Sequence, residues 1–329
     1  MVNHLGNWRN GELGNFITLK RGFDLPQQKR EDGQVPIFSS SGITGTHSTA
    51  MVNAPGVITG RYGTIGEVFY AAKDFWPLNT TLFVEDFHGN DAKFIYYFLK
   101  TLEWSKFTSA SAVPGINRNT VHKETVSLPD IETQRRIAST LSMLDEKIKT
   151  NTEINDNLQR QLRTIFKAEF TDNPELENIT QIPLSELCHV VTKGTTPTTL
   201  GKPFVERGIN FIKAESILDD HSIDKSKFAF IDEETNALLK RSIIHAGDVV
   251  FTIAGTLGRF ALIDENVLPA NTNQAVAIIR ADLEKVLPEY IYTCFIGEWH
   301  TDYYAKRVQQ AVQANLSLTT IKSLPIPLL

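Results

Sequence analysis

The chain contains an internal repeat, and this repeat constrains its fold more than any other feature. The segment 60–66 (GRYGTIG) corresponds to 252–258 (TIAGTLG), and thirteen residues after each of these segments Asn79 corresponds to Asn271, so both matches have an offset of 192 residues. Weaker matches keep the same order: ITLKRG, ending at Gly22, corresponds to HVVTKG, ending at Gly194. Self-similarity of motif and spacing predicts two copies of one domain.

A long helix is predicted between the two copies. Apolar residues recur there at alternating intervals of four and three, which is the seam that a coiled-coil helix presents to a partner. The seam positions are Ile137, Leu141, Leu144, Ile148, Asn151, Asn155, Leu158, Leu162 and Ile165. A helix over 130–170 would be roughly 60 Å long, and it could not bury this seam by itself. We therefore expect a second helix or a partner subunit to cover the seam, with Asn151 and Asn155 setting the register.

Each copy has the sequence pattern of a β-rich domain. Short β-branched and aromatic segments alternate with Gly and Pro, and helical segments follow near the end of each copy. Gly63, Gly66, Gly255 and Gly258 are expected at tight turns or bulges. The predicted fold is α+β, with two similar β-rich domains over 1–129 and 172–329 and a coiled-coil-type spacer helix over 130–171. The second copy carries a partly acidic insertion between Ile212 and Gly247, which we expect to be peripheral.

Composition and charge narrow the choice of function. Hydrophobic residues make up 41% and charged residues 22% of the chain, as in soluble globular proteins. The absence of a long apolar run and of a signal-peptide pattern predicts a cytoplasmic location, and Cys188 and Cys294 are expected to be reduced thiols. Residues 1–129 contain 12 basic residues (Lys and Arg) and 11 acidic ones (Asp and Glu). Residues 130–170 contain 7 of each, and residues 171–329 contain 14 basic and 20 acidic residues. A nucleic-acid partner would therefore require basic residues segregated on one face.

The repeated loops contain the candidate nucleic-acid contacts. Arg61 and Tyr62 lie between glycines, where a ligand can approach closely: Arg can pair with guanine or phosphate, and Tyr can stack. A plain structural turn is the alternative interpretation of this loop. Asn and Gln side chains suit adenine edges, although Asx turns explain them equally well. The candidates are Lys20, Arg21, Arg61, Tyr62, Asn79, Thr80, Arg118, Asn119, Lys193, Thr195, Thr196, Arg259, Asn271, Asn273, Gln274 and Asn315.

The sequence contains no motif for catalysis. Its eight histidines have no metal-ligand spacing, and there is no Walker loop, dinucleotide fingerprint or methyltransferase motif pair. We expect neither an enzymatic activity nor a metal in this chain.

The chain resembles the DNA-specificity (S) subunit of type I restriction-modification systems over essentially its whole length. The resemblance rests on GVITGRYGTIGEVFY with WPLNTTLFV, on GDVVFTIAGTLGRFALI with NTNQAVAIIR, and most specifically on LPDIETQRRIASTLSMLDEKI. It implies two target-recognition domains that each read one half of a split, asymmetric DNA sequence, while the spacer helix sets the length of the unread gap. It also implies a non-catalytic subunit.

The resemblance further implies a set of partners. These are double-stranded DNA, two methyltransferase (M) subunits and restriction (R) subunits, with S-adenosylmethionine, ATP and Mg on the partner subunits and no cofactor on this chain. Members with two recognition domains usually have a second long helix after the second domain, whereas this sequence ends at LPIPLL. We therefore expect a separate helix or a second S chain to cover the spacer helix.

Two other interpretations stay open. The repeat and the seam alone would also permit a non-enzymatic, two-headed coiled-coil interaction or adhesion protein. A fragment of a fused restriction-methyltransferase would require cofactor motifs that the sequence lacks.

Overall fold

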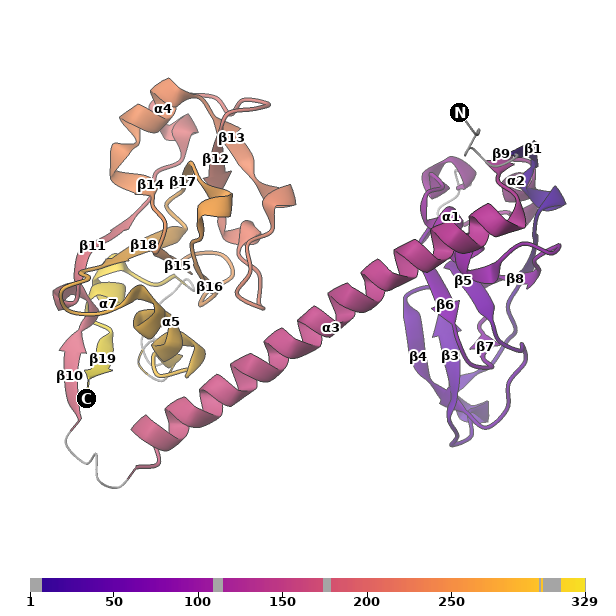
Figure 1. The fold of residues 1–329 in the computed structure, drawn as a ribbon, viewed down its shortest axis with the longest axis horizontal. Coiled ribbons are helices and arrows are strands. Elements are labelled where there is room, and N and C mark those ends of the chain that lie inside the picture. Colours follow the sequence, from indigo (N-terminus) through magenta and orange to yellow (C-terminus); the bar gives the residue numbers. More distant parts are fainter. Residues whose placement is uncertain (1–7, 109–114, 174–178, 302, 304–314, 329) are drawn as a thin grey trace. The chain divides into compact units, whose positions relative to one another are not determined.

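The computed structural model describes residues 8–108, 115–173, 179–301, 303 and 315–328. The chain divides into two compact units, unit 1 (Met1–Asn151) and unit 2 (Thr152–Leu329). Each unit has its own sheets and its own hydrophobic clusters. The helix α3 (Ile131–Phe170) begins in unit 1 and ends in unit 2 (Figure 1).

The described residues of unit 1 form three sheets and two helices besides its part of α3. The strands are β1 (Arg9–Glu12), β2 (Thr18–Arg21), β3 (Val35–Ser39), β4 (Gly42–His47), β5 (Gly56–Gly60), β6 (Val68–Ala71), β7 (Trp76–Pro77), β8 (Thr81–Asp86) and β9 (Thr125–Leu128), and the helices are α1 (Ala92–Lys100) and α2 (Arg118–His122). An antiparallel sheet has the order β2-β8-β5-β6, a second sheet has the order β4-β3-β7, and β1 pairs with β9.

Unit 2 contains the same arrangement with one additional strand. Its strands are β10 (Thr180–Pro183), β11 (Cys188–Lys193), β12 (Ile209–Ile212), β13 (Ala229–Ile231), β14 (Ile243–Ile244), β15 (Val249–Thr252), β16 (Phe260–Leu262), β17 (Ala270–Thr272), β18 (Val276–Ala281) and β19 (Pro325–Leu328), and its helices are α4 (Glu233–Leu238), α5 (Pro288–Ile296) and α7 (Leu318–Lys322). The sheets have the orders β11-β18-β15-β16 and β13-β12-β17-β14, and β10 pairs with β19.

The structure confirms two similar β-rich domains separated by a long helix. The order β2-β8-β5-β6 in unit 1 matches β11-β18-β15-β16 in unit 2. Single hydrogen bonds match as well: the Ile116 amide donates to the Arg61 carbonyl at 3.0 Å, and the Leu316 amide donates to the Ile253 carbonyl at 2.8 Å. The four predicted turn glycines (63, 66, 255 and 258) have φ between +76° and +85°, a region in which a side chain would be strained.

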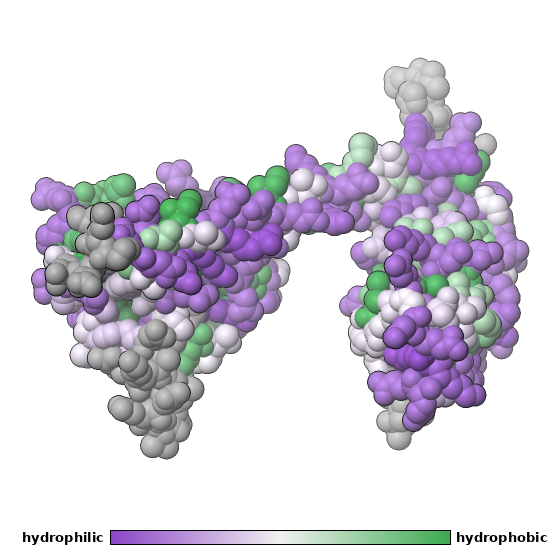
Figure 2. All heavy atoms as spheres, turned by 90° about the horizontal axis from the view of Figure 1, so that it is seen from below, coloured by the Kyte–Doolittle hydropathy of each residue, from purple (hydrophilic) through white to green (hydrophobic). Residues whose placement is uncertain are grey.

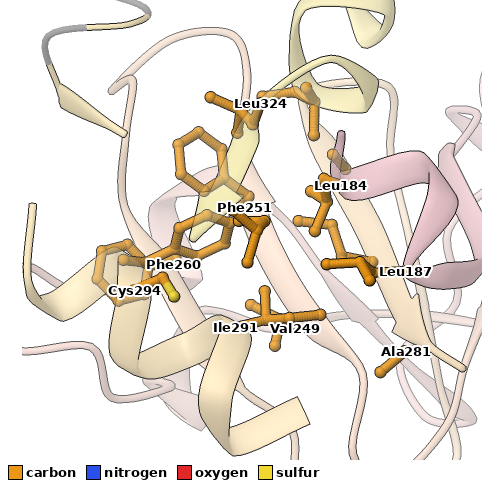
Figure 3. Close-up of a cluster of buried hydrophobic side chains, with 14 of the residues drawn as sticks. Leu184, Leu187, Val249, Phe251, Phe260, Ala281, Ile291, Cys294 and Leu324 are labelled. Carbon is orange, nitrogen blue, oxygen red and sulfur yellow. The ribbon is translucent and has the colours of Figure 1, made fainter. Parts of the chain in front are cut away.

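The core of unit 2 explains why Val249, Val250 and Phe251 of β15 are all apolar. Successive side chains of a strand point to opposite faces of its sheet. Val249 and Phe251 pack in one hydrophobic cluster, while Val250 packs in another, so both faces of this strand are buried. Figure 3 shows Phe251 and Phe260 gathered against Cys294 of α5 in the first of these clusters.

The insertion of unit 2 is not peripheral, contrary to our expectation. It contributes β13, which pairs antiparallel with β12 and so covers that strand's edge. Ile217 and Ile231 are completely buried, and Leu239 is 5% exposed. Acidic residues of the same segment, such as Asp219 and Glu234, are exposed.

The helix α3 confirms the predicted spacer and keeps much of its seam exposed. Its start is capped, because the Asp130 carboxylate accepts from the Thr133 amide at 2.9 Å. Leu144, Ile148 and Leu158 are 53%, 65% and 57% exposed. Figure 2 shows hydrophobic side chains among hydrophilic ones along this helix. Among the described residues, no helix has the length and apolar character needed to span a membrane.

Each unit is attached to the part of α3 that it contains. In unit 1, the buried Gln134 side chain donates to the Asn90 side chain at 2.7 Å and accepts from the Asp91 amide at 2.9 Å. Further along α3, the Asp145 carboxylate accepts from the Tyr97 hydroxyl of α1 at 2.7 Å. In unit 2, Phe166 is 2% exposed and belongs to the main cluster. The ends of α3 are therefore held by burial as well as by hydrogen bonds.

The buried His300 makes the stability of the chain depend on pH. Its ring is 4% exposed among the rings of Phe251, Phe260 and Phe295, and burial lowers the pKa of His300 to about 4. Because this folded-state pKa lies below the ordinary value of about 6.5, the unfolded chain binds the proton first as the pH falls. The stabilisation is complete above about pH 6.5 and is lost as the pH falls toward about 4, by on the order of 2–3 kcal/mol.

We therefore expect His300→Leu to flatten the dependence of the free energy of unfolding on pH between about pH 6.5 and about pH 4. Denaturant titrations of wild type and variant across this range measure the effect. The matched control is His245→Asn, which removes an exposed imidazole and keeps the buried one, so the slope that His300 causes should persist. An identical slope in His300→Leu and wild type would contradict the assignment.

Candidate nucleic-acid interface

A cleft of about 800 Å³ in unit 1 brings together candidate residues from three separate segments. Lys20 and Arg21 come from β2, Arg61 and Tyr62 from the loop after β5, and Arg118 from the first turn of α2. Their side chains surround one concave surface although they span about a hundred positions in the sequence. We call this surface the basic cleft.

Arg61 is positioned for recognition by contacts that leave its terminal nitrogens available. Its guanidinium carbon lies 4.5 Å from the centre of the Tyr62 ring, a cation–π contact. Its Nε donates to the Ile116 carbonyl at 3.4 Å, and its amide donates to the Thr80 carbonyl at 2.8 Å. No described residue accepts a hydrogen bond from its two terminal nitrogens, so the planar fork can bind a planar acceptor pair.

The other basic residues of the cleft differ in how far their charge is compensated. Lys20 forms an ion pair with Glu85, and a nitrogen of Arg21 lies 3.9 Å from Asp24. Surface pairs of this kind are weak and exchange readily with other anions. Arg118 is exposed and has no ion pair among the described residues. Arg61 and Arg118 are therefore the uncompensated charges of the basic cleft.

Residues behind the lining of the cleft have structural roles. His122 of α2 accepts from the Leu19 amide through Nε2 at 2.9 Å, which joins α2 to β2. Burial, followed by the nearby Arg118 charge, lowers the pKa of His122, so the ring stays neutral and can accept this bond. Asn79 donates to Asp24, and the Thr80 carbonyl accepts from two loop amides. Asn79 and Thr80 thus support the loop around Arg61.

The positions in unit 2 that correspond to Arg61 and Arg118 carry no charge. Ile253, which corresponds to Arg61, is 2% exposed, and Ala254 corresponds to Tyr62. Leu318 takes the place of Arg118 at the first position of α7. Unit 2 therefore cannot bind a ligand with the same side chains as unit 1.

A second polar surface forms in unit 2 around the end of β11. Lys193 is exposed there, Thr196 donates to Gln274, and the Arg241 guanidinium donates to the Thr195 hydroxyl at 3.3 Å. Sequence reasoning did not identify Arg241. It lies in the insertion and has no counterpart in the first copy, so the repeat gave no signal for it.

Two candidates of unit 2 are already bound to other residues of the chain. Asn271 is completely buried, and its side chain donates to Asn236 at 2.8 Å and to the Leu239 carbonyl at 3.2 Å. We therefore remove Asn271 from the set of contact candidates. Arg259 binds Asp219 through two nitrogens at 2.6 and 2.7 Å.

The remaining polar candidates show no shared geometry. The Asn273 side chain accepts from the Ala275 amide at 3.0 Å, which is the Asx turn that was the alternative interpretation. Asn119 and Asn315 are exposed, each next to the start of a short helix.

A comparison with protein families identifies the type of domain. The model for the type I restriction modification DNA specificity domain matches residues 6–160 and 177–328.

Known proteins with similar sequences are specificity subunits. The type I restriction enzyme HindI specificity subunit of Haemophilus influenzae is 34% identical over 76 residues, which are 22% of this chain and 17% of that protein. The MjaIX specificity subunit of Methanocaldococcus jannaschii is 25% identical over 171 residues, which are 50% of this chain and 38% of that protein. The matched parts thus span less than half of the length of these relatives.

A solved structure has the same fold. The crystal structure of the type I restriction-modification S subunit from M. genitalium superposes with a TM-score of 0.66 at 16% sequence identity, covering 100% of this chain and 86% of that chain.

Proposed function

Because the chain belongs to the type I restriction-modification DNA specificity family, we propose that it reads a split, asymmetric sequence in double-stranded DNA, one half-site with each unit. The observation that supports this most directly is that one topology occurs twice while the residues lining equivalent positions differ. Two domains with the same fold but different surface residues can bind two half-sites of different sequence. The chain is then a non-catalytic specificity subunit that directs partner enzymes to the target.

The basic cleft of unit 1 is the proposed contact with the first half-site. The fork of Arg61 matches guanine O6 and N7, and it matches a phosphate equally well. Tyr62 fixes the guanidinium plane, so little side-chain entropy is lost on binding. Arg118, Lys20 and Arg21 add phosphate contacts, which supply affinity without reading the sequence.

The surface around the end of β11 is the proposed contact with the second half-site. Gln274, Thr195 and Thr196 offer donors and acceptors in place of a free guanidinium, and an amide side chain can bind adenine N6 and N7. Lys193 and Arg241 would bind phosphates. Asn119 of unit 1 and Asn273 and Asn315 of unit 2 stay as further proposed contacts.

Enzymatic partners complete the proposed function. Two methyltransferase subunits and restriction subunits would assemble with the chain, and they would bring S-adenosylmethionine, ATP and Mg. The spacer α3, roughly 60 Å long, would set the separation of the two half-sites.

Methylome sequencing tests this function. The chain would be expressed with its methyltransferase partners, and modified bases would be mapped along the genome. We expect one split motif with two defined blocks and an unread gap of fixed length. Absence of any motif that depends on the chain would contradict the proposal and favour the two-headed interaction protein.

The exposed seam of α3 is the proposed interface with another helix. Ile137 and Leu141 line a shallow apolar groove with Thr133 and Thr140, and Leu144, Ile148 and Leu158 continue the apolar stripe. A separate helix or a second S chain would cover this stripe, with Asn151 and Asn155 specifying its register.

Replacement of Ile148 by glutamate is expected to prevent this assembly. A carboxylate buried in an apolar seam has no partner, so binding of the covering helix should weaken by at least about tenfold. Because Ile148 is 65% exposed in the chain itself, the free energy of unfolding should change by no more than about 0.5 kcal/mol.

The matched control is Asn157→Glu, which places the same carboxylate on α3 but outside the seam. Light scattering and sedimentation of the assembled complex measure the result. If Ile148→Glu and Asn157→Glu assembled equally well, the seam would not be the interface.

A further inference from the structure

A loop of the insertion, formed by residues 217–223, contacts α3. The Gln159 side chain of α3 donates to the Asp220 carbonyl of this loop at 3.1 Å. Leu162 of α3 and His221 of the loop line a common groove of about 390 Å³. Because the loop belongs to the insertion, the first copy of the repeat has no counterpart of it.

The other side of the 217–223 loop is bound to the β15–β16 hairpin. Arg259, at the end of this hairpin, holds Asp219 through two nitrogens at 2.6 and 2.7 Å and donates to the Ile217 carbonyl at 3.2 Å. The His221 ring stacks on Phe260 of β16 with the ring centres 4.0 Å apart. The loop therefore connects the sheet of unit 2 to the side of α3.

Internal hydrogen bonds make the 217–223 loop a preshaped block. Ile217 and Ile223 pair as an antiparallel bridge, and the Leu218 amide donates to the Ser222 carbonyl at 3.0 Å. The Asp220 carboxylate accepts from the Ser222 amide at 3.0 Å and from its hydroxyl at 2.6 Å. Because a loop with these internal bonds has little freedom to deform, it can hold the sheet of unit 2 in one position relative to α3.

The loop is a second attachment point, separate from the one at the end of α3. At the first point, Phe166 packs so closely against Gly297 that a Cβ at position 297 would lie 2.3 Å from its ring. Arg163 adds a hydrogen bond to the Ile296 carbonyl at 3.2 Å. Gln159 precedes Phe166 by seven residues, which places the two points roughly 10 Å apart along the helix.

Two points of attachment restrict tilting in a way that one point cannot. If unit 2 could shift by about 1 Å relative to α3 at a point roughly 10 Å from the first attachment, it could tilt against the helix by about 6°. At the far edge of a domain of this size, about 30 Å from the helix, such a tilt is a displacement of about 3 Å, which is close to the roughly 3.4 Å between base pairs. Loss of the second point would therefore permit errors of about one base pair.

We infer that the 217–223 loop fixes the orientation of unit 2 on α3 and thereby restricts the DNA target to a single gap length. This inference rests on the proposed function, since it assumes that the two units read separate half-sites. Gln159 and His221 act as positioning residues, because they would hold unit 2 without touching DNA. Arg259 then serves the loop through Asp219 and does not bind phosphate.

The test compares gap lengths selected by the assembled complex with its methyltransferase partners. The DNA probes are duplex libraries that hold two randomised blocks at separations differing by one base pair. The test protein is the double variant Gln159→Ala, His221→Gly, which removes the hydrogen bond to α3 and the ring on Phe260; glycine also suits the φ of +67° at position 221. The control is Gln161→Ala, whose side chain donates to Asn157 of the same helix and to no other described residue.

Wild type and control should prefer one gap by about tenfold or more over its neighbours, because DNA must be twisted or compressed to fit the others. For the double variant we expect this preference to fall to about twofold to threefold, with the same two half-site sequences selected. The single variant Gln159→Ala should show a smaller change in the same direction. It replaces the double variant in the test if the double variant does not fold.

Two outcomes separate failure of the inference from failure of the proposed function. If both the Gln159→Ala variant and the double variant preferred one gap length as strongly as wild type does, the proposed role of the loop would be wrong. If the wild-type complex selected no split sequence at all, the proposed function itself would be wrong.

Discussion

Replacement of Arg61 by alanine is expected to weaken binding of the assembled complex to its DNA target by about tenfold to a hundredfold, because one bidentate contact is lost. The loss should concern the first half-site alone, since the position that corresponds to Arg61 in unit 2 is the buried Ile253. Fluorescence anisotropy with duplexes mutated in either half-site measures this difference. Equal losses at both half-sites would contradict the assignment of the basic cleft.

A second substitution at this position identifies the acceptor. Lysine keeps the charge but lacks the planar fork, so Arg61→Lys should restore most of the binding if the partner is a phosphate and little of it if the partner is guanine. In the phosphate case, Arg61→Ala should also reduce the slope of log K against log salt by about one. Arg30→Ala, in unit 1 but outside the basic cleft, is the control and should bind like wild type.

Replacement of Phe166 by alanine is expected to destabilise the chain by about 3–5 kcal/mol. The ring is 2% exposed, stacks on Phe170 with centres 4.6 Å apart, and meets Trp299 edge to face at 6.1 Å. Its removal leaves a cavity beside Gly297, the residue that follows α5. Chemical denaturation monitored by tryptophan fluorescence measures the loss.

The neighbouring residue provides the control for Phe166. Ile165 is 59% exposed and belongs to the seam, so Ile165→Ala should change the free energy of unfolding by no more than about 0.5 kcal/mol. It should instead weaken assembly with the covering helix. Of these two adjacent residues of α3, Phe166 would then contribute to stability and Ile165 to assembly. A large loss of stability in Ile165→Ala would contradict this assignment.

The repeat and the helix were predictable from the sequence because both are periodic. An offset of 192 residues and a four-three seam are visible without knowledge of any contact. The predicted turn glycines are confirmed because positive φ is a local requirement. The pairing of strands was not predictable: β2 lies beside β8, more than sixty residues later, and short strands of similar composition carry no signal that selects a partner.

The candidate site was predictable in unit 1 and less so in unit 2. Arg61, Tyr62 and Arg118 converge because the Ile116 amide donates to the Arg61 carbonyl, which joins the segment before α2 to the loop after β5. Asn271 resembled a base-reading residue, but it lies on β17, which pairs in parallel with β12 in the interior of unit 2. The ion pair that occupies Arg259 joins residues forty positions apart and depends on the insertion. Long-range contacts of this kind have no local pattern.

The middle of α3 has a consequence for the order of assembly. Residues 146–154 are all exposed, so local helix propensity and neighbouring side chains stabilise these turns without burial. They include Thr150, Asn151 and Thr152, which are weak helix formers. Since short unburied helical segments are marginally stable in water, local opening of these turns requires little free energy. If another helix covers the seam, as we propose, we expect its binding to complete the folding of the spacer, so that the half-site spacing would be set during assembly and not before it.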